Sequence, residues 1–179
     1  MVLAEIGASF PSVIKPVQRL TFKDKAKWTL IILALYFLMG SVIIWGINPD
    51  AVVEFEFYEI IFGSKMGSLI TLGIGPIVTA SIILQLLVGS KILNWDTKTP
   101  DGKAKFMGTQ KILAVTFCFI EAIAYVIAGA IPPAGGGALI AFLVILQLAF
   151  GGIIIMFMDE VCSKWGFGSG ISLFIAAGV

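Results

Sequence analysis

The chain has 179 residues, of which 59% are hydrophobic and 13% are charged, and its formal net charge is +1. A mean hydropathy of +1.04 is typical of a protein that lies in lipid, and it leaves little room for a separate soluble domain. The sequence contains no histidine, so the commonest general base and the commonest metal ligand are missing, and neither an enzyme nor a metal site is predicted.

Residues 1–27 are predicted to form an amphipathic N-terminal arm. Apolar residues recur at helical spacing from Phe10 to Leu20 beside basic residues, a pattern typical of helices that lie in the headgroup plane. Pro11 and Pro16 should keep that helix short or interrupted. No apolar run here is followed by a small-residue cleavage site, so a removable secretory signal is not expected.

Four later runs are nearly free of charge and close to the roughly 20 residues that a helix needs to cross a bilayer. A fifth apolar run is still apolar at Val179, which predicts an incomplete last span and an incomplete chain. The predicted spans are residues 28–46, 73–94, 110–131, 138–158 and the start of a fifth at 165–179, with a cytoplasmic loop at 95–109.

The distribution of lysine and arginine predicts a cytoplasmic N-terminus. Five basic residues precede the first span, the next connection holds Lys65 alone against four acids, and the connection after that holds five lysines. Cytoplasmic segments carry the basic excess, so these segments read as inside, outside and inside. Short basic stretches at helix ends, without interleaved aromatics, do not predict direct nucleic-acid binding. The uncharged segment 131–138 should then be a tight external hairpin.

Residues 51–72 are too acidic to span a membrane and too apolar for a solvated loop, so we expect a re-entrant or surface-lying piece. The alternation in VVEFEFYEI also fits a strand, but an open strand edge is not tolerated in lipid. A short helix shielded by protein is therefore favoured.

Gly73, Gly75 and Pro76 interrupt the chain where the second span begins. Proline suits the first helical turn, so the pattern predicts a short piece, a break, and a span from about Pro76. Discontinuous helices at membrane depth occur where they face protein or a water-filled cavity, which indicates a pathway through the molecule. A plain kinked helix is the alternative.

Polar and sulfur-bearing side chains inside the predicted spans are expected to serve packing. Cys118 and Cys162 lie far apart in apolar regions, so neither a redox motif nor a zinc site is indicated. Gln85, Gln110 and Gln147 are expected to hydrogen-bond between helices.

Several stretches of the sequence resemble SecY, the large channel subunit of archaeal and eukaryotic protein translocons. They are GIGPIVTASIILQLLVGSKI, KFMGTQKIL, DEVCSKWGFGSGISLFIAAGV and FKDKAKWT before the first span. The resemblance covers nearly the whole chain and is closer to the archaeal type, but such subunits have ten spans. It implies an all-α integral membrane fold, in which this chain is the five-helix first half of an inverted-repeat channel with a broken second helix made of a plug and a span.

The resemblance also implies a pore ring of apolar side chains. The contributions from this half would be Ile74 and Val78 in the second span and Ile171 and Ile175 in the fifth. Each pair is spaced i, i+4, which puts both side chains on one helix face and suits an apolar constriction. Lipid contact or core packing is the ordinary role for any isolated isoleucine in a span.

The family's mobile plug and lateral gate can be placed in the same way. Thr79 and Glu121 match the gate, and Glu121 is the only acid inside a predicted span, so it needs a polar partner. A proton relay in a small transporter is the alternative for Glu121, and a fixed external cap is the alternative for the plug. The expected plug residues are Phe55, Phe57, Tyr58, Ile60, Ile61, Gly63 and Ser64.

The function implied is that of a non-enzymatic channel in the cell membrane, which moves polypeptides across and releases hydrophobic segments sideways into lipid. A small helical solute transporter or a membrane scaffold is the alternative. The implied partners are a SecE-type clamp subunit, a small single-span beta subunit, the ribosome, a signal-bearing nascent polypeptide and the lipid bilayer, with no cofactor.

Overall fold

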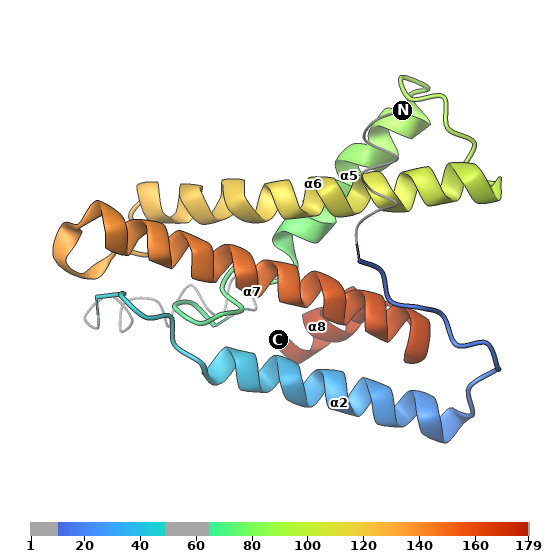
Figure 1. The fold of residues 1–179 in the computed structure, drawn as a ribbon, viewed down its shortest axis with the longest axis horizontal. Helices are drawn as coiled ribbons and strands as arrows, with labels where there is room; N and C mark the ends of the chain where they lie inside the picture. The colour runs from blue at the N-terminus through green and yellow to red at the C-terminus, as the bar shows by residue number, and fades with distance from the viewer. Residues whose placement is uncertain (1–10, 49–64, 179) are drawn as a thin grey trace.

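The computed structural model describes residues 11–48 and 65–178, and residues 1–10, 49–64 and 179 lie outside that description. In the described part the helices α6 and α7 run side by side as a long antiparallel hairpin, α5 crosses α6 on one side, and α8 lies between α7 and α2 on the other (Figure 1). The elements in chain order are α2 (Phe22–Ser41), α5 (Gly75–Gly89), α6 (Pro100–Ile127), the short 3-10 turn η1 (Ala134–Gly136), α7 (Ala138–Trp165) and α8 (Gly170–Gly178).

Helix α2 starts before the predicted residue 28 and ends before residue 46. Its start is set by Thr21, whose hydroxyl oxygen accepts from the backbone N–H of Asp24 and caps the first turn. After the helix, the chain pairs with the turn segment before α5. Ile44 N–H donates to the Gly67 carbonyl at 2.9 Å, and Ile43 forms an isolated antiparallel β-bridge with Ser68.

The chain just before α5 is a series of tight turns. Residues 65–74 are turns closed by bonds such as Ser68 N to Lys65 O and Gly73 N to Ile70 O, so the helix favoured for 51–72 is absent from its described part. Most of these turn residues are buried, as irregular backbone at membrane depth requires. Helix α5 follows with Pro76 in its first turn, which confirms the predicted break, but its 15 residues extend only about 22 Å.

Helix α6 starts before the predicted residue 110 and ends before residue 131, whereas α7 extends past the predicted residue 158. Thr99 caps α6 by accepting from Gly102 N–H, so the predicted loop 95–109 is helical from Pro100 onward. α7 continues through Trp165, because Glu160 forms an ion pair with Lys164 one turn later. Both helices are long and apolar enough to cross a membrane, and the tight hairpin expected between them is confirmed.

The first described residues do not form the predicted amphipathic helix. Residues 11–20 are non-helical, and Val17 is fully exposed. Two prolines remove backbone donors from this short stretch. Its carbonyls are bound instead by side chains of α6 and α7, among them Trp165 Nε1, which donates to Ile14 O at 2.9 Å.

The last helix begins later than the predicted 165. Residues 166–169 form a non-helical link after α7, and α8 starts at Gly170. One core cluster is shared by α2, α5, α6, α7 and α8, and a second lies between α6, α7 and the chain after α2. Cys118 and Cys162 are both free and buried in these clusters, which confirms their expected packing role.

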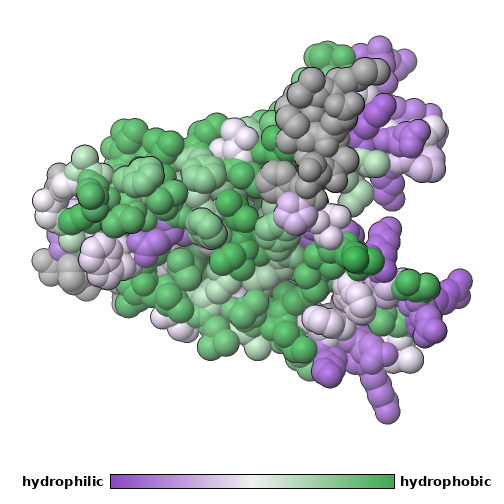
Figure 2. Space-filling view, viewed as in Figure 1, coloured by the Kyte–Doolittle hydropathy of each residue, from purple (hydrophilic) through white to green (hydrophobic). Residues whose placement is uncertain are grey.

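The surface divides into a broad apolar body and a hydrophilic end (Figure 2). The hydrophilic end holds the starts of α2 and α6 and the end of α7, where lysines gather (Figure 1). A soluble bundle would turn its polar faces outward along its length, whereas a lipid-facing bundle exposes apolar side chains. The exposed apolar side chains of the body include Leu30, Phe37, Leu38, Ile120, Ile127, Leu139, Phe142 and Phe150.

Candidate functional site

Ile74 and Val78 lie at the start of α5, where the turn segment becomes a helix. Val78 N–H donates to the Ile74 carbonyl at 3.0 Å, so the two side chains are one helical turn apart and share a face, as the spacing predicts. Both are half-buried, and Ile74 packs against the core cluster shared by the five helices.

Ile171 and Ile175 occupy successive turns of α8. Ile171 is half-buried and packs against the same cluster as Ile74, whereas Ile175 is 52% exposed. The fold thus brings one member of each predicted ring pair to a common cluster. Helix α8 is held there by Phe174, which is 1% exposed and stacks on Tyr36 of α2 with ring centroids 4.8 Å apart.

The carboxylate of Glu121 lies against the start of α5. A Cβ placed on Gly75 would come within 3.1 Å of Glu121 Oε2, so the absence of a side chain at Gly75 makes room for the acid. A carboxylate is favoured near the positive end of a helix. Thr79 follows Gly75 by one turn on the same helix, but among the described residues no hydrogen bond joins Thr79 to Glu121.

The expected plug lies outside the described residues, and its assignment stays a prediction. It comprises Phe55, Phe57, Tyr58, Ile60, Ile61, Gly63 and Ser64.

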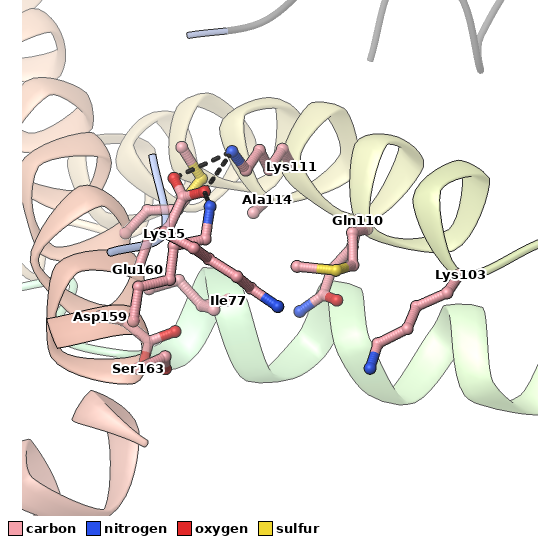
Figure 3. A pocket seen from close by; sticks show the side chains of 12 residues that line it. Lys15, Ile77, Lys103, Gln110, Lys111, Ala114, Asp159, Glu160 and Ser163 are labelled. Atoms are coloured by element: carbon pink, nitrogen blue, oxygen red, sulfur yellow. Dashed lines mark hydrogen bonds and ion pairs between the residues drawn. The ribbon is translucent and has the colours of Figure 1, made fainter. Parts of the chain in front are cut away.

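A charged cluster at the lysine-rich end was not predicted. Glu160 is 9% exposed and pairs with Lys111 of α6 at 2.8 Å and with Lys164 at 2.7 Å (Figure 3). Lys111 and Lys164 also donate to the carbonyls of Pro11 and Val13, so the cluster joins α6, α7 and the N-terminal segment. The i, i+4 spacing of Glu160 and Lys164 is visible in the sequence, but Lys111 is far away in the chain and carries no such signal.

A cavity of about 230 Å³ opens beside this cluster, between α5, α6 and α7 (Figure 3). Its wall mixes charged and apolar side chains, with apolar residues from α5 and both long helices. The residues that line it are Lys15, Ile77, Lys103, Met107, Gln110, Lys111, Ala114, Met156, Asp159, Glu160, Ser163 and Lys164.

One of the three glutamines joins two helices as expected, because Gln110 Nε2 donates to Ser81 Oγ of α5 at 2.6 Å. Gln147 of α7 instead bonds the N–H and the carbonyl of Trp45, in the non-helical chain after α2, both at 3.0 Å. Gln85 is exposed and, within the described part of the chain, bonds no other helix. The prediction for Gln85 is therefore wrong in this structure.

The described part of the chain is an all-helical bundle with an apolar exterior, an interrupted second helix and a lysine-rich end, which places it in the class of helical membrane proteins. The sequence pattern of the SecY family matches residues 68–179, and the chain belongs to that family.

A relative from Methanocaldococcus jannaschii, named protein translocase subunit SecY, is 51% identical over 99% of this chain and 40% of its own length. The channel in a structure of Sec61 in the canine ribosome–channel complex from the endoplasmic reticulum superposes with a TM-score of 0.82 at 51% identity, over 97% of this chain and 40% of that chain. A structure concerning the plug domain of SecY and the closed translocation channel gives a TM-score of 0.80 at 49% identity, over 96% of this chain and 39% of that chain. The chain thus spans about 40% of the length of such relatives.

Proposed function

We propose that these residues form one half of the central, channel-forming subunit of a protein translocon. The observation that carries the proposal is 51% identity, over 99% of the chain, with a protein translocase subunit. The channel moves polypeptides across the membrane and releases hydrophobic segments sideways into lipid, without catalysing a covalent reaction. The names of the relatives support this function over a small solute transporter or a scaffold.

The proposed constriction is formed by apolar side chains from α5 and α8. The packing of Ile74 and Ile171 against one cluster supports it, because side chains from two helices must converge to close a pore. Val78 and Ile175 lie one turn further along each helix and complete this half's share of the ring. An apolar ring excludes ions because water leaves a narrow apolar constriction when no polypeptide fills it.

The proposed gate and plug complete the path. Glu121 lies where α6 meets the start of α5, and parting of these two helices opens a route from the pore to lipid. The proposed plug, residues 55–64, lies outside the described residues, and its proposed role is to close the external side of the ring and to move aside during transport.

The proposed setting is the cell membrane with a cytoplasmic N-terminus. The lysines at one end support this orientation, since basic residues accumulate on the cytoplasmic side. The ribosome, a SecE-type clamp subunit and a small single-span beta subunit are the proposed partners. A structural relative in a ribosome–channel complex supports the first of these.

The constriction is tested by replacing Ile74 and Val78 with glycine in the full-length subunit, assembled with its partners in planar bilayers. Loss of bulk from the ring should raise the resting ion conductance several-fold. The control is Ile83→Gly, which introduces the same helix-weakening residue on another face of α5. Equal conductance in the ring variant, the control and the unchanged protein would remove these side chains from the constriction.

A further inference from the structure

The first turn of α8 is held by a side chain of another helix. Ile171 N–H donates to Oδ1 of Asp159 at 3.0 Å, and a Cβ placed on the adjacent Gly170 would lie 3.0 Å from the same oxygen. The first N–H groups of a helix have no partner within the helix, and a carboxylate is favoured at that end by the helix dipole. Here the acceptor comes from α7, so the Asp159 side chain binds one of these N–H groups and joins α8 to α7.

The backbones of α7 and α8 touch at the same point. Gly170 is buried, and a Cβ placed on it would lie 2.7 Å from Asp159 Cα and 3.2 Å from Cys162 Cβ. Backbone atoms cannot give way as a flexible side chain can, so only glycine permits this separation. The short contact fixes the distance between the helices, and the hydrogen bond from Ile171 N–H to Asp159 fixes the orientation of the first turn of α8.

Ile171 is the residue whose N–H Asp159 binds, and it is also the α8 side chain that packs on the cluster shared with Ile74. A further restraint on α8 is the Phe174–Tyr36 stack, one turn later. Two fixed points are needed to hold a short helix against both sliding and tilting. The neighbouring Glu160 cannot replace Asp159, because Lys111 and Lys164 already bind its carboxylate.

We propose that Asp159 is a positioning residue for the channel constriction, because its carboxylate fixes the first turn of α8 and so sets where Ile171 meets the ring. This inference rests on the proposed function, since positioning Ile171 matters to the channel only if Ile171 belongs to the proposed ring. Asp159 acts through the backbone of Ile171, and the proposal requires no contact between Asp159 and translocating polypeptide.

The test compares Asp159→Ala with Asp159→Asn in the full-length subunit, assembled with its partners. Alanine removes the acceptor but is a good helix former, so α7 should persist. Asparagine keeps a side-chain oxygen that can accept the same hydrogen bond from Ile171 N–H. Asp101→Ala is the control, because Asp101 is an exposed acid in the first turn of α6. Two quantities are measured for each variant: amide hydrogen exchange of the peptide covering α8, and resting ion conductance.

Asp159→Ala should speed exchange in the first turn of α8 by roughly tenfold, since the lost hydrogen bond has a carboxylate as its acceptor. It should also raise resting conductance, while Asp159→Asn and Asp101→Ala stay near the unchanged protein on both measures. A general loss of folding would speed exchange in α6 and α7 as well, and asparagine would not correct it; that pattern would overturn the proposal.

Failure of this inference differs from failure of the proposed function. Ile171→Gly is measured in the same bilayers as a direct ring variant. Raised conductance in Ile171→Gly with unchanged conductance in Asp159→Ala would leave the ring in place and overturn the role of Asp159. Unchanged conductance in Ile171→Gly would remove Ile171 from the ring and overturn the inference with it.

Discussion

Glu121 combines two features that a structural role alone does not explain. It is an acid within a predicted span, where an ionised group costs about 3 kcal/mol on insertion scales unless it is paired, protonated or hydrated. It also lies against Gly75 at the start of α5, where the helix is interrupted. Opening of the proposed gate requires α5 and α6 to separate. A polar side chain between these helices makes their contact weaker than apolar packing would.

Glu121→Leu should therefore hold the proposed gate closed more firmly. Export of substrates with weakly hydrophobic signal sequences should fall several-fold, while strong signals are still accepted, because only strong signals supply enough binding free energy to part the helices. Translocation into vesicles of a graded signal series measures this effect. Glu121→Gln, which keeps size and polarity, is the control. If the leucine and glutamine variants both keep the signal dependence of the unchanged protein, Glu121 is not part of the gate.

At the residue scale, the features that the sequence reveals are those with local signals. The shared helix face of Ile74 and Val78 and the role of Pro76 in starting α5 can be read from neighbouring positions, whereas the assignment of these side chains to a ring comes from the family resemblance. The bonds from Lys111 to Glu160 and from Ile171 to Asp159 join different helices, so they depend on tertiary packing. A single sequence holds no signal for such pairs.

At the scale of elements, α7 is held against the turn segment before α5 by a backbone contact. A Cβ placed on Gly151 would lie 1.8 Å from the Leu69 carbonyl oxygen and 2.9 Å from its carbon. Such an overlap cannot be relieved by rotating a side chain. The turns at 65–74, which lead into the proposed ring, are therefore seated directly on α7.

Gly151→Ala should lower the free energy of unfolding by about 1–3 kcal/mol, because the added methyl must displace backbone. Thermal unfolding of the full-length protein in detergent measures the change as a lower Tm. The matched control is Gly89→Ala at the end of α5, where an added Cβ meets nothing within 4 Å. This control should be neutral or slightly stabilising, since alanine favours helix. Equal Tm values for the two variants would contradict the close packing of α7 on Leu69.

The helices themselves were predictable from apolar runs, but their ends were not. Hydropathy marks the part of a helix suited to lipid, whereas Thr21 and Thr99 start α2 and α6 in charged sequence outside that part. The predicted arm helix failed for a different reason. Its carbonyls are bound by side chains from α6 and α7, including Trp165, and no periodicity within the arm encodes those partners.

At the scale of the whole molecule, composition alone predicts a helical membrane protein, and the apolar body with its lysine-rich end agrees with that class (Figure 2). The family resemblance added the arrangement of the helices, which superposes on channel structures with a TM-score of 0.82. A pore ring is a property of both halves of a channel. The proposed roles of Val78 and Ile175 therefore depend also on side chains from the other half of the channel.

The central claim, that α5 and α8 line a protein-conducting pore, is tested most directly by site-directed crosslinking. Photoreactive probes at Val78, Ile171 and Thr79 are placed in the full-length, assembled complex with a ribosome-stalled, signal-bearing nascent chain. We predict crosslinks from the translocating segment to Val78 and Ile171, and from the signal segment near Thr79. Ribosome-bound, intact complexes that give no crosslink at any of the three positions would contradict the pore and favour a membrane scaffold.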